Sequence, residues 1–578
     1  MRNHLTKLIS PLIICLFAIF IIFPEITHHA MIVGVDYAFH MNRFYDTAMQ
    51  IKSANISPFQ TNFGFDQSGR IVNAVYGPVI AYINGLLLLI CKTIFNYQIV
   101  SNLIVLITAG ILIYFLAVKN HVSKFNALFI SMIYMGTHPV LAWITGQQFT
   151  GMGAAILPLL FIPATQMIKK HDVNLILLAI SMVLLLQTHF MSSAVGAVAI
   201  LPFFIVGLIS APNKHKKMLL FKHTVEAALL TILLTLNLWA NLFEVSGTNH
   251  IIPIFPQTDF NTDTIMWSNW SLDLLGPLVT LMFAALLIFT IIRWRKISLV
   301  NRVTVFTGII FLWMSSWLFP WNQLSRFLPI LDTTVQLPKR LMVISCILLL
   351  LAIGMDLSTV KIPQWAQIIK IAIVLFIFGD FAIDTHHNIN SFLTDWSSKQ
   401  VVSSDQTVQS LTIQEKNPDK LRHALLKDNF QKSAPLVQKT IPDYLPAREK
   451  ITPANYYNYH FRRNYYYQII KPSIQTKKTV NGTNLNVTWN NNFNQSKWQM
   501  IPITKYAHSS VKLNGKYVSN AKTSAIGTLV VKAKPGQNHV QLSYQPSLIW
   551  KALMIIFTLS WIGFILDLIF KKGKWHRQ

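Results

Sequence analysis

The chain has 578 residues, of which 52% are hydrophobic and only 12% are charged. Soluble globular proteins carry about 25% charged residues, so this composition excludes an ordinary soluble enzyme and, with its repeated apolar runs of about 20 residues, indicates a polytopic membrane protein. The 49 Lys and Arg against 22 Asp and Glu lie largely in short loops and one large polar region. Membrane topology and anionic lipid explain that excess better than nucleic acid does.

Apolar segments that predict membrane helices follow one another along the chain. The first comes after the basic residues of Arg2–Lys7 with no clean small-residue cleavage site, which predicts a retained signal anchor. The cysteines all lie inside such segments, which argues against a disulfide framework or a Cys-based metal site. The thirteen segments are 8–24, 74–95, 98–117, 124–143, 151–168, 173–189, 192–210, 224–242, 272–292, 303–319, 341–356, 366–384 and 548–570.

Thirteen crossings conflict with the distribution of basic residues. They would place the basic tail Lys571–Arg577 outside, whereas Lys and Arg favour the cytoplasmic side. Segment 74–95 contains Gly77-Pro78 and Asn84-Gly85, which interrupt a clean span. We therefore expect a polytopic α-helical membrane protein with about twelve spanning helices and a re-entrant or juxtamembrane helix near 76–93.

This topology predicts three regions. They are a transmembrane domain over 1–385 with a first outer loop at 25–73, an extracytoplasmic domain over 386–547, and a last transmembrane helix with a basic cytoplasmic tail over 548–578. Asn514-Gly515 between alternating apolar runs predicts a hairpin. A small β-sandwich is expected within 479–545, with strands at Leu485–Trp489, Trp498–Thr504, Ser510–Leu513, Tyr517–Val518, Gly527–Lys532 and Val540–Tyr544.

The first outer loop carries the leading candidate for catalysis. At helical spacing Asp36, His40 and Arg43 share one face, which predicts an amphipathic helix lying on the bilayer with these groups toward water. Asp36 could be a general base, a ligand for a divalent metal, or only the N-cap of that helix. His40 and Arg43 could hold phosphate or orient the carboxylate, or could be solvated surface residues.

Further candidates lie near the outer ends of the helices. Arg326, Lys339 and Arg340 could clamp phosphate oxygens, or could extend their charges to the membrane interface. His189 could line a cavity or make a hydrogen bond between helices, and Glu244 is a possible second carboxylate. Few charges fall at mid-membrane, which argues against an ion-coupled transporter and favours a reaction between a lipid headgroup and an extracytoplasmic acceptor.

Short motifs at both ends of the chain resemble one group of membrane proteins. Gly34-x-Asp36-x-x-x-His40-x-x-Arg43, Ile56-Ser57-Pro58 and Tyr76-Gly77-Pro78 are similar to the first-loop pattern of bacterial GT-C membrane glycosyltransferases. The branch is the YfhO-like proteins and the 6-pyruvoyl-tetrahydropterin-synthase-related membrane proteins. Three motifs near the end of the chain resemble the carboxy-terminal β-domain of these proteins. They are Asp443-Tyr444-Leu445-Pro446, Lys512-Leu513-Asn514-Gly515-Lys516 and Gly536-x-Asn538-x-Val540.

The resemblance implies an enzyme of the bacterial cytoplasmic membrane. It would transfer a sugar from a polyprenyl-phosphate donor to an outer cell-envelope acceptor such as teichoic acid, with Asp36 as the catalytic carboxylate. Tyr37 and Ala38 stand where better-known relatives have an acidic pair, so a requirement for a divalent cation stays open. A lipid or polymer translocase and a noncatalytic envelope-assembly scaffold are the alternatives.

Overall fold

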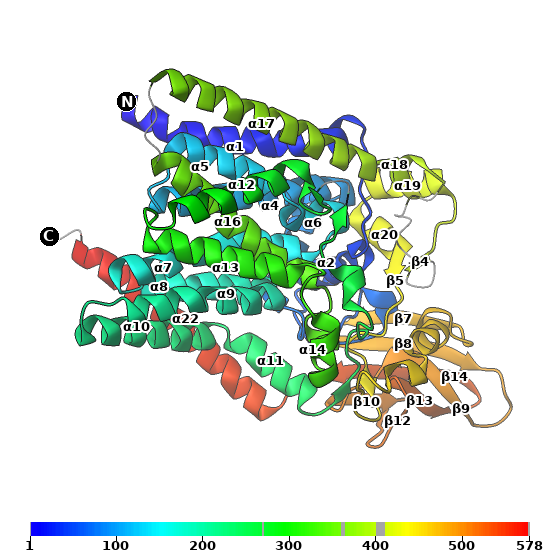
Figure 1. Cartoon of the computed structure of the whole chain (residues 1–578). Coiled ribbons are helices and arrows are strands. Elements are labelled where there is room, and N and C mark those ends of the chain that lie inside the picture. Colours follow the sequence, from blue (N-terminus) through cyan, green and yellow to red (C-terminus); the bar gives the residue numbers. More distant parts are fainter. Residues whose placement is uncertain (1, 269–270, 360–363, 400, 402–410, 576–578) are drawn as a thin grey trace. The chain divides into compact units, whose positions relative to one another are not determined.

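A computed structural model describes residues 2–268, 271–359, 364–399, 401 and 411–575 (Figure 1). The chain divides into two compact units. The first unit comprises residues 1–37, 95–228 and 257–405, and the second comprises 38–94, 229–256 and 406–578.

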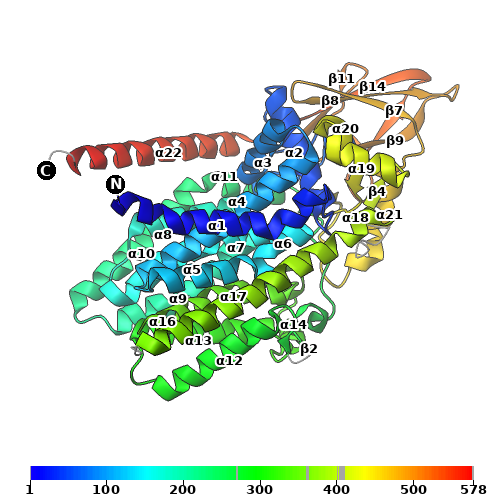
Figure 2. The same cartoon turned by 90° about the horizontal axis from the view of Figure 1, so that it is seen from above.

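The first unit is a helical bundle. In it α7 packs against both α8 and α9, α1 runs beside α17, and α13 packs against α16 and α12 (Figures 1 and 2). Its helices are α1 (Arg2–Thr27), α4 (Ile94–Lys119), α5 (Lys124–Met135), α6 (His138–Gly146), α7 (Phe149–Lys170), α8 (Leu175–Thr188), α9 (Phe190–Ile209), α12 (Gly276–Arg293), α13 (Leu299–Ser315), α14 (Trp321–Phe327), α15 (Leu331–Thr334), η3 (Pro338–Leu341), α16 (Met342–Thr359), α17 (Gln364–Phe392) and α18 (Thr394–Ser397). Helix α10 (Lys214–Leu234) begins in this unit and ends in the second.

Within the described residues, seven helices are long and apolar enough to cross a membrane, or up to nine if each of two bent pairs is one span. Several apolar helices of this length indicate a multi-pass membrane protein. The bent pairs are Lys124–Met135 with His138–Gly146, and Lys214–Leu234 with Leu236–Ser246.

Within the part of the chain that the structure describes, fewer helices qualify as spans than the twelve or so expected. Helix α8 has 14 residues and reaches only about 21 Å, against a hydrocarbon core of about 30 Å. Segment 124–143 is broken near Gly136, where α5 and α6 meet at 41°. The helix expected near 76–93 is α3 (Pro78–Cys91), which also has 14 residues and is short for a span.

The second unit contains α2 (Tyr37–Lys52), α3 and α11 (Leu236–Ser246), with a β-sandwich and the long helix α22 (Leu548–Trp575). A five-stranded sheet has the order β11-β10-β14-β8-β7, and a three-stranded sheet has the order β12-β13-β9. Apolar residues from both sheets, such as Val487, Ile501 and Leu529, form the core between them. The strands are β7 (Thr476–Asn481), β8 (Asn484–Asn491), β9 (Lys497–Thr504), β10 (Ser509–Leu513), β11 (Lys516–Tyr517), β12 (Lys522–Thr523), β13 (Thr528–Ala533) and β14 (Gly536–Tyr544).

All six expected strands are present, with ends that differ by a few residues. The Asn514-Gly515 hairpin is confirmed, because β10 pairs with β11 and both turn residues have positive φ, at 48° and 82°. Positive φ at both central residues is the geometry of a tight hairpin turn. Strand β7, at the edge of the five-stranded sheet, was not expected. Its sequence is almost entirely polar and so does not show the alternation of apolar and polar residues that predicts a strand.

Smaller elements complete the second unit. Helix α19 (Pro418–Lys427) and helix α20 (Phe430–Ser433) precede β5 (Val437–Lys439), which pairs with β4 (Leu411–Ile413). Strand β1 (His250–Ile251) pairs with β6 (Pro446–Ala447), so the chain after α11 is joined to the segment that leads into the sandwich.

Candidate functional site

A pocket in the first unit brings together several of the residues predicted from sequence. His189, Lys339 and Arg340 all line it, and so does His138. We call it the cationic pocket, because the Lys339 ammonium and the Arg340 guanidinium carry positive charge near neutral pH. Its remaining walls come from Pro139, Ala142, Gln148, Thr150, Met191, Ser192, Val195, Leu337 and Val343.

His138 enters the pocket at the start of α6. Pro139 occupies the first turn of that helix, where a missing N–H costs no helical hydrogen bond. The helix ends at Gln147, which adopts a left-handed conformation, so the chain reverses and Gln148 reaches the same pocket. Gly151 allows this reversal to close, because a Cβ there would lie 2.4 Å from the backbone nitrogen of Trp143.

His189 stands at the junction of α8 and α9. Its Nδ1 accepts a hydrogen bond from the backbone N–H of Ser192 at 3.3 Å and lies 2.8 Å from the Ser192 hydroxyl oxygen. Because Nδ1 is an acceptor, the proton of the neutral imidazole is on Nε2. His189 is thus the N-cap of α9, and the cap fixes its ring at the pocket wall.

Lys339 and Arg340 belong to η3, directly before α16. The Lys339 ammonium forms an ion pair with Asp263 at 2.9 Å. The Nε of Arg340 is buried and has no hydrogen-bond partner among the described residues. A buried guanidinium N–H without an acceptor is costly, so the Arg340 side chain is suited to an anionic ligand.

Asp36 is half-buried and lies immediately before α2. Its backbone N–H donates to the carbonyl of Gly146 at 3.1 Å, and Gly34 packs so closely that a Cβ would lie 2.4 Å from the Gly146 Cα. Gly34 also donates to the side chain of Gln147 at 2.7 Å. The segment carrying Asp36 is therefore bound to the turn that supplies Gln148 to the pocket. The position before a helix also keeps the N-cap role open.

Arg326 is not among the residues that line the cationic pocket. It lies in the last turn of α14 and is exposed. Of the three cationic residues that were expected to act together, the pocket thus contains Lys339 and Arg340 but not Arg326.

His40 and Arg43 lie in the second unit, and the expectation that they face water is wrong. Their side chains are 2% and 0% exposed. Arg43 donates through Nε to Asn73 at 3.0 Å and through Nη2 to the carbonyl of Tyr76 at 2.5 Å, and its Nη1 lies 3.2 Å from His40 Nδ1. Helix α2 is consequently an internal helix with a buried polar face.

Asp46, on the same helix, holds the loop that follows α2, a role that the sequence did not suggest. Asp46 accepts from the backbone N–H groups of Phe63 and Gly64, at 2.8 and 3.2 Å, and from Gln50 at 2.6 Å. The loop then makes a left-handed turn at Phe65–Gln67, where three non-glycine residues have φ between 49° and 56°. Each such residue costs about 1 kcal/mol or more, and the buried contacts to α2 offset this.

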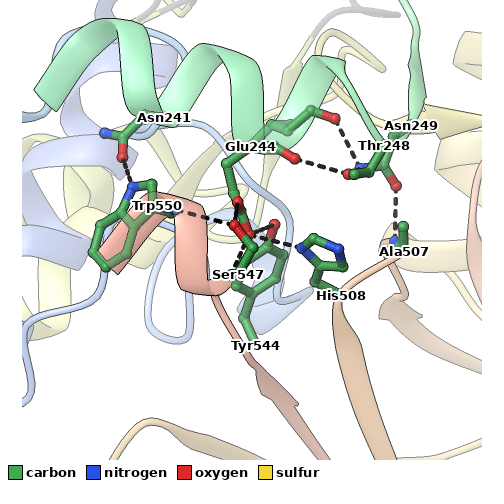
Figure 3. A network of polar contacts seen from close by, with 10 residues as sticks. Asn241, Glu244, Thr248, Asn249, Ala507, His508, Tyr544, Ser547 and Trp550 are labelled. Atoms are coloured by element: carbon green, nitrogen blue, oxygen red, sulfur yellow. Dashed lines mark hydrogen bonds and ion pairs between the residues drawn. The ribbon is translucent and has the colours of Figure 1, made fainter. Parts of the chain in front are cut away.

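Glu244 also has a setting that the sequence did not suggest. Its carboxylate is 6% exposed and accepts from His508 Nδ1 at 2.7 Å, from the Ser547 backbone N–H at 2.9 Å and from the Ser547 hydroxyl at 2.5 Å (Figure 3). Trp550 adds a bond from its indole to Asn241 at 2.7 Å. These contacts join α11 to the end of the sandwich and the start of α22, which gives Glu244 a structural role within the second unit.

The described residues contain no group of three or more His, Cys, Asp or Glu side chains arranged to hold a metal ion. No family model matches the sequence. A search of curated proteins also finds no match.

Proposed function

We propose that this protein is a membrane glycosyltransferase that moves a sugar from a polyprenyl-phosphate donor to an extracytoplasmic cell-envelope acceptor. The observation that carries the proposal is the cationic pocket, in which Lys339 and Arg340 lie with two imidazoles. Phosphate is the ligand that such a set of donors suits best. A phosphate-linked lipid donor reaches a site of this kind from the membrane itself.

The chemistry assigned to the pocket is a single displacement. The acceptor hydroxyl oxygen forms a bond to the anomeric carbon of the sugar, and the bond from that carbon to the phosphate oxygen breaks. The phosphate leaves on its lipid with the bonding electrons, and Lys339 and Arg340 stabilise the added negative charge. The acceptor proton passes to Asp36, if Asp36 acts as the base. The alternative for Asp36 is to hold a divalent cation near the phosphate.

Two further features support this assignment. Asp36 does not line the pocket itself, but its backbone is bonded to Gly146, two residues before the lining residue Gln148. The imidazole of His189 is held by the N-terminus of α9, so its ring is positioned before any ligand binds. The proposal includes the orientation expected from the basic loops, with the pocket toward the outside of a bacterial cytoplasmic membrane.

The decisive experiment separates the catalytic role of Asp36 from the N-cap role. Asn and Ser cap helices about as well as Asp does, so Asp36→Asn and Asp36→Ser both preserve the cap and remove the base. With protein amounts matched in membranes, we expect both variants to lose transfer of labelled sugar from polyprenyl phosphate by about 100-fold or more. Normal transfer in either variant would overturn the assignment of Asp36.

Chelation distinguishes the two chemical roles. If Asp36 is the base alone, wild-type transfer is unchanged by EDTA, whereas a metal-ligand role requires that activity fall and return with added Mg²⁺ or Mn²⁺. A wild-type protein that binds the donor but transfers no sugar to any envelope fraction would instead favour the translocase or scaffold alternatives.

A further inference from the structure

The charged side chains of the β-sandwich in the second unit are all basic. Between Thr476 and Tyr544 the sequence contains no Asp or Glu. The same stretch contains nine lysines, which are Lys477, Lys478, Lys497, Lys505, Lys512, Lys516, Lys522, Lys532 and Lys534. Surfaces of soluble domains ordinarily mix both signs. A domain with cations only attracts polyanions and repels cationic partners.

The outer face of the five-stranded sheet is polar throughout. Alternate residues of its strands point into the apolar core, as Leu485, Val487 and Leu542 do, so their neighbours point outward. The strand register places one outward residue of each strand beside the next, in the row Thr479, Asn486, Gln541, Lys512 and Tyr517. A second row places Lys477 beside Thr488 and His539.

These rows offer hydrogen-bonding groups over a length that suits a chain molecule. Five strands at about 4.8 Å spacing make each full row about 19 Å long. The row ends at Tyr517, whose side chain is 72% exposed, with the Lys512 ammonium 4.5 Å from the ring centroid. An exposed aromatic ring beside a cation, followed by amides and a hydroxyl, can contact a sugar ring and its attached anion together.

From these observations we infer that the outer face of the five-stranded sheet binds a polyanionic glycan, a polysaccharide that carries carboxylate or phosphate groups along its length. The amide and hydroxyl groups of the rows bind sugar hydroxyls, and Lys477 and Lys512 bind the anions. A bilayer surface suits this face less well, because it presents amides and hydroxyls with one aromatic ring and no apolar cluster. The inference does not depend on the proposed transfer activity.

The test uses the full chain in nanodiscs made of uncharged phosphatidylcholine. The probes are polygalacturonate, which is an anionic glycan, uncharged dextran, and vesicles that contain phosphatidylglycerol. We expect wild-type protein to bind polygalacturonate more tightly than dextran, with an affinity that falls as salt rises. Equal binding of dextran and polygalacturonate, or binding of the vesicles but not of polygalacturonate, would overturn the inference.

Matched variants locate the surface. The double variant Lys477→Gln with Lys512→Gln removes two charges from the proposed face, and we expect it to weaken polygalacturonate binding about tenfold. The control, Lys522→Gln with Lys532→Gln, removes two charges from the three-stranded sheet and should change the affinity less than about twofold. Equal losses in both double variants would mean a general charge effect and would refute a defined face.

A second variant tests the stacking contact. Tyr517→Ala leaves every charge in place, and its side chain is too exposed to support the core. We expect polygalacturonate binding to weaken about fivefold or more, as for other sugar or base rings stacked on an aromatic side chain. Unchanged binding would remove Tyr517 from the surface. Pocket variants such as Arg340→Gln should leave this binding intact, so failure of the proposed function would not be mistaken for failure of this inference.

Discussion

The guanidinium carbon of Arg43 lies 4.6 Å from the ring centroid of Tyr76, and the same side chain donates to the Tyr76 carbonyl. Both contacts hold the segment around Tyr76 against α2 within the second unit. A charge that the sequence suggested for binding substrate is therefore used inside the protein, where carbonyl and amide oxygens surround it.

The first prediction concerns this buried charge. Arg43→Lys replaces a planar fork by a single ammonium that cannot reach Asn73, Tyr76 and Gly77 together. We expect a loss of about 2–4 kcal/mol in the free energy of unfolding, measured by thermal or denaturant unfolding in detergent. The exposed Arg463→Lys change in the same unit is the control and should alter stability by less than about 0.5 kcal/mol.

A second prediction concerns the cationic pocket. Arg340→Gln removes the guanidinium whose Nε has no hydrogen-bond partner in the described part of the chain. We therefore expect kcat/KM for the lipid donor to fall about tenfold or more while the unfolding midpoint stays near wild type. Arg340→Lys should restore part of the activity, because it keeps the charge without the fork. Arg295→Gln, in the exposed connection between α12 and α13, serves as control. Equal activity of Arg340→Gln and wild type would exclude Arg340 from donor binding.

The third prediction follows from the cap of α9. A Cβ at Gly153 would lie 2.1 Å from the Ser192 hydroxyl oxygen, so Gly153→Ala displaces Ser192 and with it the ring of His189. We expect weaker donor binding, seen as a raised KM, together with a modest loss of stability of about 1–3 kcal/mol. Ser192→Ala, which keeps the backbone cap and removes the hydroxyl, should have the smaller effect on KM. A larger effect of Ser192→Ala would mean that the hydroxyl itself contacts the ligand.

A fourth prediction concerns pH. Burial raises the pKa of Asp46 to about 6 from 3.8, although hydrogen bonds from Phe63, Gly64 and Gln50 oppose the shift. Between pH 3.8 and about 6 the folded protein then binds more protons at this site than the unfolded chain does. The contribution of Asp46 to the free energy of unfolding therefore falls as the pH rises through this window.

Asp46→Asn removes that titration. As the pH rises from 4 to 6, the free energy of unfolding of wild type should fall relative to that of Asp46→Asn. Only wild type has a buried carboxyl group that must ionise in this range. Unfolding midpoints measured at several pH values across this window provide the test. A difference that is independent of pH would show that Asp46 keeps an ordinary pKa.

The fifth prediction concerns the network around Glu244. Glu244→Gln keeps the size of the side chain but replaces one carboxylate oxygen by an NH₂ group, which can only donate. That group would face the hydrogen-bond donors of Ser547 and His508, which both need an acceptor. We expect a loss of about 1–3 kcal/mol and faster hydrogen exchange at the start of α22. Glu226→Gln removes one partner of an exposed i,i+4 pair with Lys222 and should cost less than about 0.5 kcal/mol. Similar losses in both variants would contradict the structural role of Glu244.

The sequence by itself determined the elements whose signals are local. Apolar runs identified a multi-pass protein, and alternation with Asn514-Gly515 located the strands and one hairpin. It also singled out His189 and the adjacent pair Lys339 and Arg340. The pair lies about 150 residues from His189 in the chain, yet all three line one pocket. These predictions succeed because periodicity, turn chemistry and the cost of burying charge act over a few residues at a time.

Only the tertiary structure decided how those residues are used. Asp36, His40 and Arg43 share a helical spacing, yet Arg43 is fully buried and its guanidinium is bound by the loop 73–77. Glu244 and Ser547 are 303 residues apart and meet in one network. Helix lengths, and with them the number of spans, also depended on where the chain breaks. The spacing of residues in the sequence shows which side chains share a face of a helix. Whether those side chains are buried, and which groups they contact, depends on what packs against that face. Distant parts of the chain supply that packing.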